Sequence, residues 1–288
     1  MIYLRLYGGL GNQMFQYAFG YALSKKYDKR LVIETNYFSE NTKLCTPRSF
    51  ELDVYKITSQ ITKLPFFAHS KILVKIFQKF PVFNIFSKVK YFPEKSFTYN
   101  DILIKPSLDY FFDGYWQSFK YFEEYREELL QVFSNISVDP INAALMSRIS
   151  NNNSISVHIR RGDYVTNNIA SSHHGTCSLD YYRDAINYFQ SLYKDACFFV
   201  FSDEPQWAKD NIVFPPTTTF INHNTGKNSY LDMHLMSKCR HNIIANSSFS
   251  WWAAWLNSND HKIVIAPMKW FNTEVDTTDL IPPTWIRL

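Results

Sequence analysis

The stretch YLRLYGGLGNQMFQYAFGYALS, Tyr3–Ser24, passes from an apolar run through a glycine cluster into a helical pattern. The apolar residues of Ile2–Leu6 predict a strand, and those of Gln13–Lys25 recur at the spacing of one helix face. A second apolar run, Arg30–Glu34, follows. A strand, a helix and a second strand in succession are typical of a parallel sheet. The opening of the chain therefore predicts an α/β fold.

The glycine cluster needs its own explanation, because three of the eight glycines fall at Gly8, Gly9 and Gly11, directly before Asn12. Glycine lets the backbone approach a ligand closely, and the N-terminus of the following helix offers free N–H groups to an anion. The loop lacks the Gly-Lys-Ser/Thr of a Walker A loop and the last glycine of the dinucleotide-binding pattern. Taken alone, the glycine loop is equally consistent with a purely structural turn and with an anion-binding site.

The middle of the chain is less regular. We interpret residues 36–101, which contain several prolines, as an irregular insertion with short helices. Asp109–Trp116 predicts a strand entering a loop, and Phe119–Phe133 predicts an amphipathic helix. A polar asparagine run near residue 150 is the best candidate for a boundary. We therefore expect domains at 1–150 and 151–288, with the final segment packing back on the first domain.

Beyond the asparagine run, four short apolar runs alternate with helical patterns, which predicts a second, doubly wound α/β domain. The expected strands are 154–160, 196–203, 242–246 and 262–267, and the expected helices are 178–193, 229–239 and 250–258. In open parallel sheets, ligands bind beyond the carboxyl ends of the strands. The residues that follow each strand are therefore the candidates for a site.

Composition excludes several classes of protein. The net charge is +4 without any block of Lys or Arg, so the electrostatic pattern of a nucleic-acid-binding protein is missing. The four cysteines form no C-x-x-C pair, which indicates reduced thiols and no zinc site. No carboxylate pair or His/Asp/Glu cluster has the spacing of a metal site. Aromatic residues make up 18%; most are expected in the core, and some suit a hydroxylated ligand such as a sugar.

The expected location is the cytoplasm. The chain begins directly with a strand, without the pattern of a signal peptide, and no run reaches the 18 apolar residues of a spanning helix. Ile72–Phe86 is interrupted by lysines and a proline. We expect it to pack on its own domain, and a peripheral contact with the inner face of the membrane is the alternative.

Two arginines, Arg160 and Arg161, stand at the end of the strand expected at 154–160, in the sequence HIRRGDY. Side chains two apart share one face of a strand, so His158 and Arg160 are presented together. An arginine fork at a strand end suits phosphate oxygens. Arg161 points the other way and is expected to pair with Asp163.

Two further strand ends add polar groups. Asp203 stands at the end of the strand expected at 196–203, where it could accept hydrogen bonds from a purine or cap the next helix. Ser247 and Ser248 precede the apolar helix of NSSFSWWAAW, where hydroxyls and free amides suit phosphate, and Ser250 is an alternative cap. Because no metal spacing is present, these groups would have to stabilise a departing diphosphate themselves. The strand ends predict a metal-independent enzyme that uses a nucleotide sugar.

Four motifs, GGLGNQMFQYA, HIRRGDY, FSDEPQW and ANSSFSWWAAWL, resemble in order and spacing those of the bacterial α-1,2-fucosyltransferases, glycosyltransferase family 11. The resemblance covers most of the chain outside 36–110. It implies a GT-B-like fold, with two Rossmann-like domains facing a central cleft. It also implies inverting transfer of L-fucose from GDP-β-L-fucose to the 2-hydroxyl of a galactoside, without a cofactor. The setting it implies is bacterial glycan biosynthesis, such as assembly of O-antigen or capsule repeats.

The resemblance also assigns roles to individual residues. Donor-binding residues by this resemblance are Gly9, Gly11, Asn12, His158, Arg160, Asp203, Ser247 and Ser248. Arg160 would bind the β-phosphate, His158 and Asp203 would contact guanine, and the two serines would touch the pyrophosphate. The glycine loop with Asn12 would face the sugar-phosphate from the other domain.

The general base is the open point of this comparison. Some relatives have a glutamate shortly after the H-x-R-R motif, whereas this chain has no carboxylate there after Asp163. The candidates for the base are therefore Asp163 and His174, with His173 beside it, or no residue at all. Arg160 is the catalytic candidate on the side of the leaving group. Two other classes compete with the transferase: a non-catalytic module that binds a nucleotide or glycan, and a Rossmann oxidoreductase, against which the incomplete glycine pattern argues.

Overall fold

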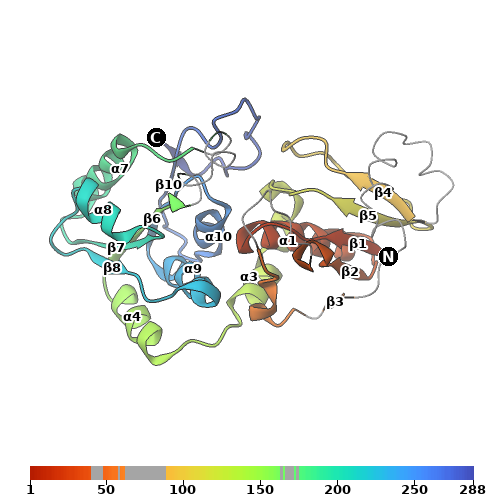
Figure 1. Ribbon diagram of the computed structural model, residues 1–288, viewed down its shortest axis with the longest axis horizontal. Helices are drawn as coiled ribbons and strands as arrows, with labels where there is room; N and C mark the ends of the chain where they lie inside the picture. The colour runs from red at the N-terminus through yellow and green to blue at the C-terminus, as the bar shows by residue number, and fades with distance from the viewer. Residues whose placement is uncertain (40–47, 58, 62–88, 163–164, 166–171, 173–174) are drawn as a thin grey trace. The chain divides into compact units, whose positions relative to one another are not determined.

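The computed structural model describes residues 1–39, 48–57, 59–61, 89–162, 165, 172 and 175–288 (Figure 1). The chain divides into two compact units. Unit 1 is Met1–Val132 with Asp276–Leu280, and unit 2 is Phe133–Val275 with Ile281–Leu288. The division thus falls earlier in the chain than the expected boundary at residue 150.

Hydrogen bonds of two segments, one before residue 150 and one near the C-terminus, explain this division. The helix α4 (Pro140–Ser150) precedes the expected boundary, yet its Asn142 exchanges hydrogen bonds with Asn224 of unit 2 at 2.9 Å. The late segment Asp276–Leu280 is tied to unit 1 by Asp279, which accepts a hydrogen bond from the Tyr99 N–H at 2.7 Å. Asp279 also pairs with Lys120.

Unit 1 is built on a five-stranded sheet of order β3-β2-β1-β5-β4, and all its pairings are parallel. Its strands are β1 (Ile2–Arg5), β2 (Leu31–Glu34), β3 (Gln60–Ile61), β4 (Val89–Pro93) and β5 (Asp109–Asp113). The central strand β1 is followed by α1 (Leu10–Lys26), as the opening of the sequence predicts. Phe15 and Phe19 of α1 are fully buried, because the helix packs along the sheet.

The segment before unit 2 differs from the expected single helix at 119–133. It forms two 3₁₀ turns, η5 (Phe119–Tyr121) and η6 (Glu123–Tyr125), and then the shorter helix α3 (Arg126–Ser134). Aromatic packing accounts for the difference. Tyr121 lies edge-on against Phe19 at 5.1 Å and Phe122 against Phe15 at 6.0 Å, so this turn follows the surface of α1. The described part of unit 1 contains two further 3₁₀ turns, η1 (Asn36–Ser39) and η2 (Leu52–Tyr55).

Unit 2 contains a six-stranded sheet of order β11-β10-β9-β6-β7-β8, again with parallel pairings. Its strands are β6 (Asn153–Ile159), β7 (Ala196–Ser202), β8 (Thr219–Ile221), β9 (His241–Ile243), β10 (Val264–Ala266) and β11 (Ile286–Arg287). Besides α4, the described residues of unit 2 form the helices α7 (Leu179–Leu192), α8 (Pro205–Asn211), α9 (Ser229–Lys238) and α10 (Ser248–Leu256), with the 3₁₀ turn η7 (Gly226–Asn228). The expected α/β fold with two Rossmann-like units is confirmed.

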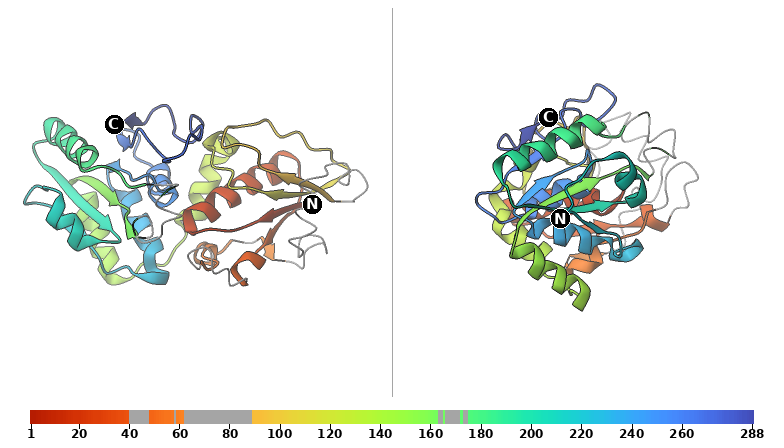
Figure 2. Two further views of the ribbon diagram at one scale, coloured as in Figure 1. Left: turned by 45° about the horizontal axis from the view of Figure 1, so that its top comes forward. Right: turned by 90° about the vertical axis from the view of Figure 1, so that its left-hand side faces the viewer.

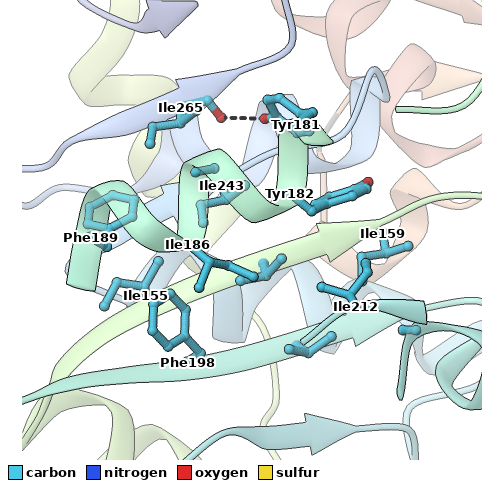
Figure 3. Close-up of a cluster of buried hydrophobic side chains, with 14 of the residues drawn as sticks. Ile155, Ile159, Tyr181, Tyr182, Ile186, Phe189, Phe198, Ile212, Ile243 and Ile265 are labelled. Atoms are coloured by element: carbon cyan, nitrogen blue, oxygen red, sulfur yellow. Dashed lines mark hydrogen bonds between the residues drawn. The ribbon is translucent and has the colours of Figure 1, made fainter. Parts of the chain in front are cut away.

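Helices cover both faces of the sheet in unit 2 (Figures 1 and 2). The odd-numbered residues of β6 face α7, where Ile155 packs with Ile186 and Phe189 in a buried cluster (Figure 3). Tyr181 of α7 closes this cluster by donating its hydroxyl proton to the carbonyl oxygen of Ile265 at 3.0 Å (Figure 3). On the other side of β6, His158 packs against Phe249 of α10. Ser156 there accepts a hydrogen bond from Nδ2 of Asn242, which also donates to the carbonyl of Met236 in α9. Within the described residues, none of the helices combines the length and apolar character needed to cross a bilayer.

Candidate functional site

The carboxyl edge of the sheet in unit 2 brings two of the predicted residues together. β6 and β7 are adjacent and parallel, with Ile159 opposite Ser202, so the residues after both strands meet. Nη1 of Arg160 lies 3.0 Å from Oδ2 of Asp203. The backbone N–H of Arg161 donates to Oδ1 of the same carboxylate at 3.0 Å.

Asp203 therefore fixes the loop that follows β6. It is not the cap of α8, because Glu204 occupies the N-cap position there. A Cβ on Gly162 would lie 2.6 Å from Oδ2 of Asp203, so only glycine allows the loop to approach the carboxylate this closely. Arg160 and Asp203 keep 26% and 23% of their side-chain surfaces exposed. The ion pair thus positions a guanidinium that a ligand in solution can still reach.

Arg161 pairs with a carboxylate, as expected; among the described residues that partner is Glu204, and Asp163 lies outside them. Its Nε lies 3.1 Å from Oε2 of Glu204, and its guanidinium stacks over the ring of Trp207 at 3.6 Å. These contacts anchor the loop to α8. The two adjacent guanidinium groups therefore pair with two adjacent carboxylates, that of Arg160 with Asp203 and that of Arg161 with Glu204.

His158 lies on the opposite side of β6 from the buried α7 cluster. Its side chain is 7% exposed and its ring lies 5.6 Å from the ring of Phe249 in α10. Burial and the nearby charge of Arg160 lower the pKa of His158 to about 3, so the imidazole is neutral. Its Nδ1 has no hydrogen-bond partner among the described residues.

The N-terminus of α10 follows β9 at the same edge. Ser247 is the N-cap, and its hydroxyl accepts a hydrogen bond from the N–H of Phe249 at 3.3 Å. Ser250 is not the cap; its hydroxyl donates back to the carbonyls of Ala245 and Ser247, both at 3.3 Å. Ser248 is half-buried at the first position of the helix. Because the cap is neutral and the first turn holds no acidic residue, the positive end of the α10 dipole keeps its attraction for an anion.

The glycine loop of unit 1 has a local structural explanation. Gly8 has a φ of +79°, and a Cβ there would lie 2.6 Å from Nδ2 of Asn12. Gly9 is the N-cap of α1, and Gly11 is buried in its first turn. Oδ1 of Asn12 accepts a hydrogen bond from Nε2 of Gln117 at 2.8 Å. These contacts leave the donor-binding roles of Gly9, Gly11 and Asn12 as predictions.

Three residues that the sequence analysis missed surround this loop. Glu51 accepts a hydrogen bond from the N–H of Leu10 at 3.0 Å, so a carboxylate of the chain itself lies at the N-terminus of α1. Burial raises the pKa of Glu51. The guanidinium of Arg48 lies 3.7 Å from where a Cβ of Gly9 would stand. Gln13 joins the two segments, donating to the carbonyls of Gly8 and Ser49 and accepting from the N–H of Glu51.

Two partly buried carboxylates elsewhere also escaped the sequence analysis. Asp232, in the first turn of α9, accepts a hydrogen bond from Nδ2 of Asn224 at 2.8 Å, and burial raises its pKa to about 7. Glu94 follows β4 and accepts from the N–H groups of Tyr115 and Trp116 at 2.7 and 3.0 Å. Burial raises its pKa to about 7 as well. No local pattern marks either residue, because their environments are built by distant segments.

Some of the predicted residues lie outside the described residues. These are Asp163, His173, His174 and the segment Ile72–Phe86. The catalytic roles of Asp163 and His174 remain predictions.

Comparison with known proteins agrees with the motifs. The family model described as Glycosyl transferase family 11 matches residues 1–288. The chain is 36% identical over 304 residues to the O-antigen biosynthesis glycosyltransferase WbnK of Escherichia coli, with 100% of both chains covered. It is 39% identical over 295 residues to an alpha-1,2-colitosyltransferase of Escherichia coli, covering 100% of this chain and 99% of that one.

Among solved structures, the α-1,6-fucosyltransferase NodZ soaked with GDP-fucose superposes with a TM-score of 0.49 at 16% sequence identity, covering 88% of this chain and 91% of that one. The match to the family model over the whole chain, together with full-length relatives above 30% identity, shows that the chain belongs to glycosyltransferase family 11.

Proposed function

We propose that the protein transfers L-fucose from GDP-β-L-fucose to the 2-hydroxyl of a galactoside, with inversion at the anomeric carbon. Support comes from the family and from relatives named for α-1,2 transfer, including a human galactoside alpha-(1,2)-fucosyltransferase 1 that is 29% identical over 107 residues. The observation that carries the proposal is the guanidinium of Arg160, held by Asp203 at the carboxyl edge that also bears the N-terminus of α10.

These groups suit a departing diphosphate. In a single displacement, the acceptor 2-hydroxyl forms a bond to the anomeric carbon as the bond from that carbon to the β-phosphate oxygen breaks. Negative charge then develops on GDP, and a planar guanidinium and helix N–H groups stabilise such charge. We assign the β-phosphate to Arg160 and the pyrophosphate to the N-terminus of α10 with Ser247 and Ser248.

The acceptor proton needs a destination. We assign it to Asp163 or His174, or to solvent if the leaving group departs early enough to keep the acceptor nearly neutral. His158 does not take it in this scheme, because a histidine with a pKa of about 3 is a poor base at neutral pH. Its neutral ring suits a contact with guanine, as does the carboxylate of Asp203. We further propose a GT-B-like arrangement of the two units.

We propose that transfer needs no metal ion, because Arg160 and the α10 N-terminus supply positive charge for the leaving group. The test is a transfer assay with GDP-fucose and a panel of galactosides, followed by linkage analysis of the product. Full activity in EDTA is expected. Loss of activity that Mg²⁺ restores would contradict the metal-free scheme, and a product linked other than α-1,2 would contradict the proposed reaction.

Transfer of colitose is the second candidate, favoured by the 39% identical relative. Colitose is L-fucose without its 3-hydroxyl, and a site that hydrogen-bonds a hydroxyl rejects the analogue that lacks it. Comparing kcat/KM for the two GDP-sugars therefore separates the candidates. A non-catalytic binding module would bind GDP-sugar but release no GDP when the acceptor is added.

A further inference from the structure

Asn246 lies at the centre of a junction between three segments at the carboxyl edge of unit 2. Its side chain is 3% exposed. Its Nδ2 donates to the carbonyl oxygens of Gly175 at 3.2 Å and Trp270 at 3.1 Å. Its Oδ1 accepts from Sγ of Cys177 at 3.5 Å.

The chemistry of this position requires an amide. Both N–H groups of Nδ2 point at carbonyl oxygens, which cannot donate, while Oδ1 receives a thiol proton. Burial raises the pKa of Cys177 to about 11, so its thiol keeps that proton at neutral pH. A carboxylate of the same shape would set an acceptor against an acceptor and leave one carbonyl, or both, without its donor.

The junction is tight at Gly175 as well. This residue has a φ of +66°, and a Cβ would lie 2.6 Å from the amide of Asn272. The segment after the H-x-R-R loop is thus held between the turn that precedes α10 and the segment at 270–272. Asn246 directly precedes Ser247, the cap of α10.

We infer that Asn246 is a positioning residue for the donor site: it fastens the Gly175–Cys177 segment and the Trp270 segment to the turn that aims the N-terminus of α10. This inference rests on the proposed binding of a GDP-sugar at that helix end. Asn246 touches no reacting group in this scheme. It acts through Ser247, Ser248 and the first N–H groups of α10.

Asn257 offers a matched control at the other end of the same helix. It follows α10 as its C-cap and is 2% exposed. Its Nδ2 donates to the carbonyl of Cys239 at 2.7 Å and to Oδ1 of Asn242 at 2.8 Å, and its Oδ1 accepts from the N–H of Asn259 at 2.9 Å. The two asparagines therefore make the same kinds of bonds in similar burial, but only Asn246 adjoins the proposed donor site.

The experiment compares Asn246→Asp with Asn257→Asp in the full chain. We measure thermal unfolding, GDP affinity by calorimetry at a temperature where each variant is folded, and transfer kinetics. Both variants should lower Tm. Only Asn246→Asp should weaken GDP binding, by about tenfold or more, and raise the KM for the donor. Asn257→Asp should keep GDP affinity within about threefold of the wild type.

Cys177→Ala is the milder variant, because it keeps both hydrogen bonds that Nδ2 of Asn246 donates and removes only the contacts of the thiol. It should stay folded and weaken GDP binding by about two- to fivefold, and it decides the matter if Asn246→Asp does not fold. Equal GDP affinity in Asn246→Asp and Asn257→Asp, or wild-type affinity in Cys177→Ala where the first variant is unfolded, would overturn the inference. If the wild-type protein itself binds no GDP, the proposed function fails instead.

Discussion

Asp203→Asn is the most informative single change, because it keeps the shape of the side chain and alters one of its two bonds. Oδ1 can still accept from the N–H of Arg161, which lies 3.0 Å away. The other position becomes an amide N–H₂ group that faces Nη1 of Arg160, formerly 3.0 Å from a carboxylate oxygen. Two donors then oppose each other, and the guanidinium loses its anchor.

The substitution should affect stability and catalytic rate to different extents. Two unit charges about 4 Å apart at an effective dielectric of about 20 attract by about 4 kcal/mol. The side chains are 26% and 23% exposed, so solvent screening reduces the effect on stability to about 1 kcal/mol. Misplacing a donor that acts on the leaving group costs about 100-fold in rate, or about 2.7 kcal/mol. We therefore expect a small fall in stability and a large fall in kcat.

Glu204→Gln is the matched control, because it breaks the neighbouring pair with Arg161, whose side chains are 19% and 32% exposed. It should cost about the same stability and leave kcat within about threefold of the wild type. The assay is release of GDP from GDP-fucose in the presence of acceptor, with Tm measured in parallel. A kcat for Asp203→Asn near that of the wild type, or an equal loss in both variants, would refute the reasoning.

Changes at three further residues have defined outcomes. Arg160→Ala and Arg160→Lys should both abolish transfer in a folded protein, since an ammonium cannot replace the planar fork; near-normal turnover of either would show that the assignment is wrong. Burial raises the pKa of Asp232 from 3.8 to about 7, so the wild type should lose stability as pH rises from about 4 to 7, by at most about 4 kcal/mol. Asp232→Asn should flatten this fall in urea unfolding, and an unchanged pH profile would contradict it. Tyr181→Phe removes a buried hydroxyl that donates to carbonyls at 2.6 and 3.0 Å; it should cost about 1–2 kcal/mol of stability without changing the KM for the donor, and a raised KM would contradict a purely structural role.

Much of the fold could be predicted because each element buries one face of its own sequence. The strand–helix–strand opening and the alternation after residue 150 both became parallel sheets. The prediction of one helix over 119–133 was wrong, because the buried face of its first part is set by a distant helix and not by its own period. Its aromatic residues suit a helical period, but they pack on α1, which the period cannot reveal.

The site could be predicted only in part. The order of strands places Arg160 and Asp203 at one edge, and the general rule for parallel sheets anticipates this. The pairing of each arginine with its carboxylate could not be predicted. It depends on the register of β6 against β7 and on the stacking of Arg161 over Trp207. Glu51 could not be predicted at all, because its contact with Leu10 requires knowing how a distant irregular segment folds back.

The two helix N-termini that the motifs emphasise are electrostatically unlike. At α1, the carboxylate of Glu51 accepts the N–H of Leu10 and so compensates the positive end of the helix dipole. At α10, the cap is the neutral hydroxyl of Ser247, and the first turn carries no acid. The guanidinium of Arg48 lies beside Gly9 and close enough to Glu51 to favour its charged form, so the α1 end already holds both signs of charge. A diphosphate would have to displace Glu51 there, whereas the end of α10 holds no acidic group. On this ground the bare backbone of the first motif suits a close approach of the uncharged sugar better than a contact with phosphate.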